Sequence, residues 1–521
     1  MSAVRRHFVC ELEDIFDGGG ACALIDGEQV AVLRVGEEVF ALENRDPFSD
    51  ANVMARGLIG DLAGQLVVAS PVYKQHFNLR SGRCLEDDAV SLRCWPCGVL
   101  DGHVWVGTVA QPAATMRARR QLIVVGNGMA AMRTVEQLLE LAPDDYAITV
   151  FGAEPRGNYN RIMLSPLLAG ETDLARIMSH PLPWYRERGI TLHAGDPVVS
   201  IDRRRKRVVS AAGVVAGYDR LLLATGSDPV RLKVTGHDLP GIFCFRSLDD
   251  VDGMLETAAG ARRAVVIGGG LLGLEAASGL AKQGLAVTVV HLRERVMDRQ
   301  LDADAAALLQ QTMQARGIDF CLSAHTRAVE GNGRVERVCM EDGRVLPADL
   351  VVVAAGITPR IDLARGCGLA CDRGILVDDT LQTYDPAIYA VGECVQHRGT
   401  TYGLVAPLWE QARVCAAHLA ERGVTRYRGS QPSSQLKVSG IEVFSAGDIS
   451  VLAGVESIRY ADHAAGIYKR LWLKDNRLQA AVLFGDTRNA GRYAELIAAQ
   501  RDVAELRDSL LLDELPASPV G

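Results

Sequence analysis

The sequence is poor in aromatic side chains, in long hydrophobic runs and in basic charge. Phe, Trp and Tyr make up 5% of its 521 residues, which is too little to predict the base-stacking platforms of nucleic-acid-binding proteins. No segment reaches the roughly 18 consecutive apolar residues that a membrane-spanning helix needs. Lys and Arg number 56 against 64 Asp and Glu, so the formal net charge is −8 and no basic face is predicted. We therefore expect neither nucleic acid nor membrane as a partner.

The sequence also lacks the cysteine pattern of a metal site. Its 12 Cys are scattered, and the close pairs are Cys94/Cys97 and Cys367/Cys371. A four-Cys zinc or iron–sulfur site needs a second close pair, which neither of these has. We expect structural thiols and no metal ligands. The N-terminal segment has no long apolar run, so no signal peptide is predicted and a cytoplasmic location is expected.

Length and local pattern divide the chain into several domains. At about 150 residues per domain, this length predicts three or four of them. The first part has short alternating segments around turns such as Asp26-Gly27, a pattern typical of antiparallel β structure. Two later stretches, 121–151 and 264–290, each read as an apolar run, a glycine turn, a helix and a second apolar run. That is the βαβ pattern of a parallel sheet, present twice. From about residue 430 the pattern becomes strands followed by a polar helix.

The two glycine turns carry the clearest functional signal. They are a G-x-G-x-x-A and a G-x-G-x-x-G motif, formed by Gly126, Gly128 and Ala131 and by Gly268, Gly270 and Gly273. In such a motif the first Gly permits a tight turn and the second lets a pyrophosphate approach. The third position lets the following helix pack close to the strand. The start of that helix offers N–H groups to phosphates. The sequence therefore predicts two dinucleotide sites.

The residues after each second strand indicate which dinucleotide each unit takes. Glu154 follows the second apolar run of the first unit, and a carboxylate there can bind ribose hydroxyls. In the second unit the sequence reads HLRER from His291, with no acid directly at the strand end. Arg293 can hold the 2′-phosphate of NADPH, whereas Glu294 keeps NADH open as an alternative.

Four further segments resemble the flavoprotein reductases that have two dinucleotide domains and a glutathione-reductase-like fold. They are Ala224-Thr225-Gly226, Gly273-Leu-Glu275, Ala355-Gly356-Ile-Thr-Pro359 and Thr383-Tyr-Asp-Pro-Ala-Ile-Tyr-Ala-Val-Gly392-Glu393. The resemblance spans about residues 120–425. It departs at Arg360, where the family often has Asn, and at Glu393, where Asp is commoner. It implies FAD in the first unit and NAD(P)H in the second, with Glu275 as the catalytic candidate beside the nicotinamide.

The segment GNYNRIMLSPLLAGE is similar to the flavin part of the large subunit of assimilatory NAD(P)H-nitrite reductase. Its Pro166 stands where ferredoxin and rubredoxin reductases carry Lys, and it has no redox Cys. The first 110 residues resemble the small subunit of that enzyme, a Rieske-like domain, with Asp46, Phe48, Ser70 and Tyr73 at the four ligand positions. Since no Cys or His stands there, the resemblance implies no iron–sulfur cluster. The chain shows no Cys-rich sirohaem segment, so we expect that it does not reduce nitrite alone.

The resemblance predicts a multidomain protein with an all-β Rieske-like domain, two α/β Rossmann-like dinucleotide-binding domains and a small α+β C-terminal domain. The expected boundaries are 1–110 for the Rieske-like domain, 111–120 for a linker, 121–245 and 351–425 for the FAD-binding domain, 246–350 for the NAD(P)-binding domain and 426–521 for the C-terminal domain. The expected cofactor-binding residues are Gly126, Gly128, Ala131, Glu154, Arg161, Thr225, Gly226, Gly268, Gly270, Gly273, Arg293, Gly356, Gly392, Glu393 and Trp409. Trp409 is included because its helix is expected to begin at the flavin.

The implied activity is electron transfer from NAD(P)H through FAD to a partner. The expected partner is the catalytic subunit of an assimilatory nitrate or nitrite reductase, and a homodimer is also expected. Two alternatives stay open: a ferredoxin- or rubredoxin-type reductase, and a non-catalytic regulatory protein that binds nucleotides with the same fold.

Overall fold

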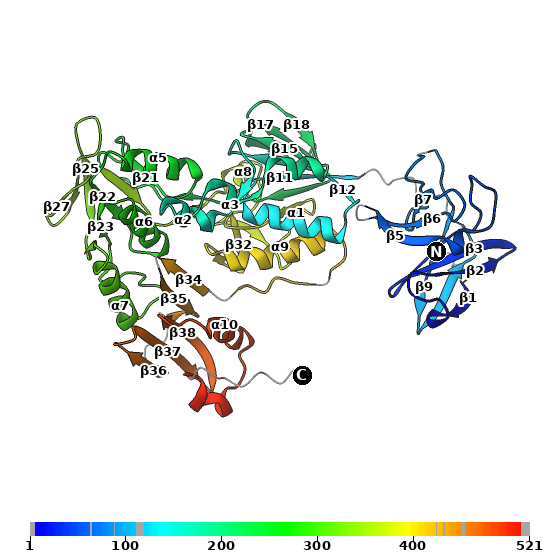
Figure 1. The fold of residues 1–521 in the computed structure, drawn as a ribbon. Coiled ribbons are helices and arrows are strands. Elements are labelled where there is room, and N and C mark those ends of the chain that lie inside the picture. Colours follow the sequence, from blue (N-terminus) through cyan, green and yellow to red (C-terminus); the bar gives the residue numbers. More distant parts are fainter. Residues whose placement is uncertain are drawn as a thin grey trace. The chain divides into compact units, whose positions relative to one another are not determined.

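The computed structural model describes residues 6–62, 65–87, 89–110, 119–423, 425–430, 433–438, 440–449 and 454–511. Contacts along the chain divide it into an N-terminal unit, Met1–Arg119, and a larger unit, Arg120–Gly521 (Figure 1). None of the helices in the described ranges has the length and apolar character that a membrane span requires.

The N-terminal unit consists of short antiparallel strands, as its turn pattern predicts. Three sheets have the strand orders β1-β10-β9, β2-β3-β4-β8 and β5-β6-β7. The strands are β1 Arg6–Glu11, β2 Gly20–Ile25, β3 Glu28–Val35, β4 Glu38–Glu43, β5 Leu58–Leu62, β6 Gln65–Ala69, β7 His76–Asn78, β8 Cys94–Trp95, β9 Cys97–Leu100 and β10 His103–Gly107. Asp26 and Gly27 join β2 to β3 with φ of 46° and 88°, the geometry of a tight hairpin turn. Two buried clusters, around Trp95 and Phe77, form the core.

The first parallel sheet of the larger unit has the order β15-β12-β11-β19-β31. Its strands are β11 Arg120–Val125, β12 Tyr146–Gly152, β15 Thr191–Ala194, β19 Arg220–Leu223 and β31 Ile388–Ala390. Helix α1, Met129–Leu141, connects β11 to β12 and packs against α9, Val405–Leu419. Strand β31 belongs to this sheet although the whole second sheet lies before it in the sequence. The first sheet is therefore interrupted by an inserted unit.

The inserted unit is a second parallel sheet with the order β21-β28-β22-β23-β24. Its strands are β21 Ile242–Cys244, β22 Arg263–Ile267, β23 Ala286–Val290, β24 Ile318–Cys321 and β28 Leu350–Val353. Its helices are α5 Leu248–Ala258, α6 Leu271–Lys282 and α7 Ala303–Gln314. This sheet extends beyond the expected range 246–350 at both ends, and β11 begins within the expected linker, at Arg120. The three-residue edge strand β21 is defined by its pairing with β28, which leaves no periodic signal in the sequence.

Short strands and helices complete the two α/β layers. The additional sheets are β13-β14, β16-β17-β18, β20-β29, β25-β26-β27 and β30-β32-β33. Their strands are β13 Asn158–Tyr159, β14 Met178–His180, β16 Val198–Asp202, β17 Arg207–Ser210, β18 Val215–Gly217, β20 Ser227–Pro229, β25 Thr326–Glu330, β26 Arg337–Met340, β27 Val345–Pro347, β29 Ile357–Pro359, β30 Ile375–Val377, β32 Val395–His397 and β33 Thr400–Thr401. The short helices are α2 Leu164–Leu168, α3 Leu174–Ile177, α4 Leu182–Glu187 and α8 Asp362–Gly366.

The C-terminal part is an antiparallel sheet, β34-β35-β38-β37-β36, with helix α10 packed on it. Its elements are β34 Ser433–Val438, β35 Ile441–Ala446, β36 Glu456–Asp462, β37 Ile467–Lys474, β38 Arg477–Phe484 and α10 Ala490–Ala499. One hydrophobic cluster joins Trp472 of this sheet to the second parallel sheet. The hydroxyl of Tyr468 (2.6 Å) and the guanidinium of Arg470 (2.9 Å) both donate to Asp302, the N-cap of α7. The C-terminal sheet is thereby attached to the inserted unit.

Candidate functional site

The first glycine turn lies between β11 and α1. Gly126 has φ +112°, and a Cβ there would lie 2.2 Å from the carbonyl oxygen of Ala224, so a larger residue is excluded on both counts. Gly128 is the N-cap of α1, and a Cβ there would point into open space. Ala131, in the first turn of the helix, is fully buried. The turn therefore leaves room directly at the start of α1, where phosphate oxygens can meet backbone N–H groups.

The second glycine turn repeats this geometry between β22 and α6. Gly268 has φ +129°, and a Cβ there would lie 2.2 Å from the carbonyl oxygen of Ala354. Gly270 is the N-cap of α6 and again faces open space. A Cβ at Gly273 would lie 1.9 Å from the carbonyl oxygen of Gly268, so only Gly lets α6 pack this close to the turn. Both turns fit the phosphates of a dinucleotide.

Both turns open on one cavity of about 1770 Å³, which is also lined by Phe444 of the C-terminal sheet. Most of the predicted site residues line it: Gly126, Gly128, Ala131, Glu154, Arg161, Thr225, Gly226, Gly268, Gly270, Glu275, Arg293, Gly356, Gly392 and Glu393. Gly273 does not line the cavity, because it lies where α6 contacts the glycine turn at Gly268.

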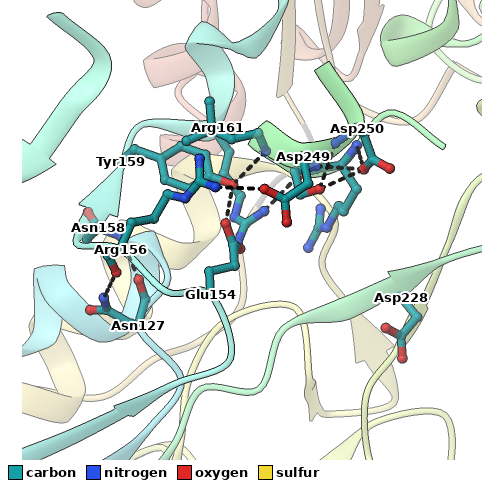
Figure 2. A network of polar contacts seen from close by, with 12 residues as sticks. Asn127, Glu154, Arg156, Asn158, Tyr159, Arg161, Asp228, Asp249 and Asp250 are labelled. Atoms are coloured by element: carbon teal, nitrogen blue, oxygen red, sulfur yellow. Dashed lines mark hydrogen bonds and ion pairs between the residues drawn. The ribbon is translucent and has the colours of Figure 1, made fainter. Parts of the chain in front are cut away.

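Glu154 is held in place at the edge of this cavity. Tyr159 donates its hydroxyl to Glu154 Oε2 at 2.8 Å, and Arg161 forms an ion pair with the other carboxylate oxygen (Figure 2). Arg161 also donates to the backbone oxygen of Arg246 at 2.7 Å. This network orients the carboxylate just beyond the end of β12, where an acid can accept hydroxyl hydrogens of a ribose.

Glu393 follows β31 of the first parallel sheet and lines the same cavity. Ser227 donates its hydroxyl to Glu393 Oε2 at 2.7 Å, and the guanidinium of Arg246 pairs with the same oxygen. The backbone N–H of Gly392 donates to the buried amide oxygen of Gln411 on α9 at 2.8 Å. Arg246 thus joins two predicted residues, since it contacts Arg161 through its backbone and Glu393 through its side chain. Arg246, which follows the short edge strand β21, was not predicted from the sequence.

Glu275 lies on α6, two residues after Gly273 of the second glycine turn, and lines the cavity. Its carboxylate accepts a hydrogen bond from the Ser165 hydroxyl at 2.7 Å. Burial raises the pKa of Glu275 to about 6, although the hydrogen bond from Ser165 opposes the rise. Pro166, which follows Ser165, supplies no cation to this carboxyl. Ser165 and the C-terminal Phe444 also line the cavity, and neither was predicted.

Trp409 lies outside the cavity. Its neighbours Val405, Ala406 and Leu408 on α9 line the cavity, whereas Trp409 is 38% exposed and lines a separate hollow of about 490 Å³. The guanidinium of Arg133 lies over its ring at 6.0 Å. Consecutive helical residues differ by about 100° in direction. The predicted helix therefore does begin at the cavity, but this side chain points away from it.

The four ligand positions of the N-terminal unit hold a hydrogen-bonded pair and two aromatic rings. Ser70 donates its hydroxyl to Asp46 at 2.6 Å, and both residues are fully buried. Burial would raise the pKa of Asp46, but hydrogen bonds from Ser70, Ser49 and the backbone lower it below its ordinary value. Phe48 is 36% and Tyr73 61% exposed. Neither pair offers the thiolates and imidazoles of a Rieske centre.

The two close cysteine pairs are free thiols. Burial raises the pKa of both Cys94 and Cys97 to about 11. Burial likewise raises the pKa of Cys367 and Cys371. Because the thiolate is the reactive and metal-binding form, these pairs have the character of structural thiols.

Two glycine turns on one shared cavity define a protein that binds two dinucleotides. Comparison with known families agrees. The family described as "Pyridine nucleotide-disulphide oxidoreductase" matches residues 120–422, and the chain belongs to this family. Residues 7–107 match "Rieske-like [2Fe-2S] domain", and residues 432–501 match "Rubredoxin NAD+ reductase C-terminal domain". The predicted resemblances of both units, and the prediction of an oxidoreductase, are confirmed.

The most informative relatives are two proteins of Bacillus subtilis (strain 168). "Nitrite reductase [NAD(P)H]" is 45% identical over 397 residues, which cover 76% of this chain and 49% of that protein. "Assimilatory nitrate reductase electron transfer subunit" is 42% identical over 396 residues, with 76% and 51% covered. The chain thus spans about half the length of these curated relatives. Among solved structures, the covalent putidaredoxin reductase–putidaredoxin complex matches with a TM-score of 0.69 at 26% identity, covering 74% of this chain and 94% of that one.

Proposed function

We propose that this chain takes electrons from NAD(P)H through FAD and passes them to the catalytic component of an assimilatory nitrate or nitrite reductase. The observation that carries the proposal is the single cavity on which both glycine turns open. Two dinucleotides bound at these turns would extend toward each other within it. Bound FAD supplies a ring that accepts two electrons from reduced nicotinamide and can release them singly.

We propose that the first unit holds FAD and the second NAD(P)H. In the first unit, Gly128 leaves space for the pyrophosphate and Glu154, oriented by Arg161, accepts from the adenosine ribose. Glu393, held by Ser227 and Arg246, would contact the ribityl or phosphate region of FAD. In the second unit, Gly270 leaves the corresponding space. Fixed donors and acceptors of this kind orient two reactants without a further entropy cost.

The proposed domain layout follows the sheets. The FAD-binding domain comprises both chain segments that contribute to the first parallel sheet, and the NAD(P)-binding domain is the inserted second sheet. The C-terminal sheet contributes Phe444 to the cavity, so it serves the same site. A homodimer and a cytoplasmic location stay predictions.

We also propose that the N-terminal Rieske-like unit carries no cluster. Asp46 and Ser70, which form a buried hydrogen bond, stand at the two Cys ligand positions, and a phenyl ring cannot ligate iron. The unit would then act as a structural or docking module. Iron analysis of the purified chain tests this, and about two iron atoms per chain would contradict it.

The acceptor is inferred from the two Bacillus subtilis relatives, whose names give nitrite reduction and electron transfer in nitrate reduction. The match of the C-terminal part to a rubredoxin reductase domain favours a second candidate, a redoxin reductase. NAD(P)H-dependent reduction of cytochrome c, measured with and without an added ferredoxin or rubredoxin, separates the two. A rate that depends on the redoxin favours the second candidate, and a redoxin-independent rate favours the first. If FAD binds and no acceptor is reduced, the result favours the alternative of a non-catalytic regulatory protein that binds nucleotides.

A further inference from the structure

The end of strand β23 differs from the usual NADH site. In a dinucleotide-binding unit the residue at this position meets the adenosine ribose, and an acid there accepts the hydroxyls of NADH. Here the residue is His291. Its Nδ1 accepts the backbone N–H of Gly269 at 3.0 Å, and its Nε2 lies 3.4 Å from Asp298 Oδ1. Because Nδ1 accepts, Nε2 carries the proton, and the ring offers no acceptor to a ribose hydroxyl.

His291 is also packed tightly into the glycine turn. A Cβ at Gly269 would lie 2.7 Å from His291 Cγ, so the ring leaves no room for a side chain at Gly269. The first unit of the same chain provides an internal comparison. Beyond the end of β12 it carries Glu154, a carboxylate oriented by Arg161 and Tyr159. The unit proposed for FAD therefore places an acid on the cavity, whereas the acid near the end of β23, Glu294, does not line the cavity and lies 3.5 Å from Arg295.

The charged side chains that line this part of the cavity are unequally paired. Arg293 and Arg299 both line the cavity, are exposed, and form no ion pair with any residue that the structure describes. Every lining carboxylate, by contrast, has a hydrogen-bond or ion-pair partner: Glu154, Asp249, Asp250, Glu275, Asp298 and Glu393. Two unpaired guanidinium groups beside a site without a free carboxylate suit a phosphate dianion, which Arg binds with two parallel hydrogen bonds.

We propose that the second unit selects NADPH over NADH, with Arg293 and Arg299 binding the 2′-phosphate and His291 keeping the ribose position free of a carboxylate. This inference rests on the proposed function for the identity of the coenzyme, and it adds the preference between the two coenzymes and the residues that set it.

The first test measures binding without turnover. Calorimetry of the FAD-loaded chain should show that adenosine 2′,5′-bisphosphate binds at least about tenfold more tightly than adenosine 5′-monophosphate, since only the former offers the 2′-phosphate. Arg293→Gln should reduce that ratio by about tenfold, the effect of one lost charge-assisted contact. Arg262→Gln is the matched control, because Arg262 is exposed and directly precedes β22, at the opposite end from Gly268. Its ratio should equal that of the wild type.

The second test compares kcat/KM for NADPH and NADH with the same variants. The wild type should prefer NADPH, Arg293→Gln should lower the NADPH/NADH ratio, and His291→Asp should lower it further because the new carboxylate repels the phosphate. Equal or weaker binding of the bisphosphate, or an unchanged ratio in Arg293→Gln, would overturn the inference. Tight bisphosphate binding without any flavin reduction would instead refute the proposed function alone.

Discussion

Replacement of Glu275 by Gln tests the environment of the buried acid in the cavity. Burial raises the pKa of Glu275 from 4.5 to about 6. Between these values the folded chain holds a proton that the unfolded chain has lost. The stabilising contribution of the neutral carboxyl is therefore fully present below pH 4.5 and is lost as the pH rises through about 6. The difference between the two pKa values corresponds to roughly 2 kcal/mol of stability.

Glu275→Gln keeps the shape and can still accept the Ser165 hydrogen bond, but it cannot ionise. We expect the free energy of unfolding of the variant to exceed that of the wild type by about 1 kcal/mol at about pH 5 and by about 2 kcal/mol at about pH 8. Urea unfolding with saturating FAD measures both values. Glu256→Gln is the control, because Glu256 is exposed on α5 and its replacement should have the same small effect at both pH values. If the stability difference between Glu275→Gln and the wild type does not grow with pH, burial does not raise the pKa of this carboxyl.

Three further changes address the rest of the architecture. Gly273→Ala places a methyl group 1.9 Å from the carbonyl oxygen of Gly268. Urea unfolding should therefore show that the free energy of unfolding falls by about 1–3 kcal/mol. Wild-type stability would mean that α6 does not pack this closely to the turn. Glu393→Gln removes the ion pair with Arg246, and FAD affinity measured by flavin fluorescence should fall about tenfold, whereas unchanged affinity would remove Glu393 from the site. Asp46→Ala leaves the buried Ser70 hydroxyl without its acceptor. The free energy of unfolding of the N-terminal unit should fall by about 1–3 kcal/mol, while flavin reduction is retained. A loss of flavin reduction would show that this unit acts in catalysis.

The sequence predicted those parts of the site that depend on local geometry. Gly126 and Gly268 follow apolar strands and need positive φ beside a backbone oxygen, which leaves a recognisable motif. Strand β21 and Arg246 were not predicted, because their place depends on pairing with β28 far along the chain. Phe444 reaches the cavity only through packing of the C-terminal sheet. For Trp409 the position of the helix was predicted, but a motif does not specify which side of a helix start faces the ligand.

The central claim is that a nicotinamide coenzyme bound at the second glycine turn reduces FAD bound at the first. Its most direct test is anaerobic mixing of the FAD-loaded chain with NADPH or NADH, with flavin absorbance followed at about 450 nm. We expect rapid bleaching, which is faster with NADPH. An absorbance that stays unchanged with both coenzymes would contradict it.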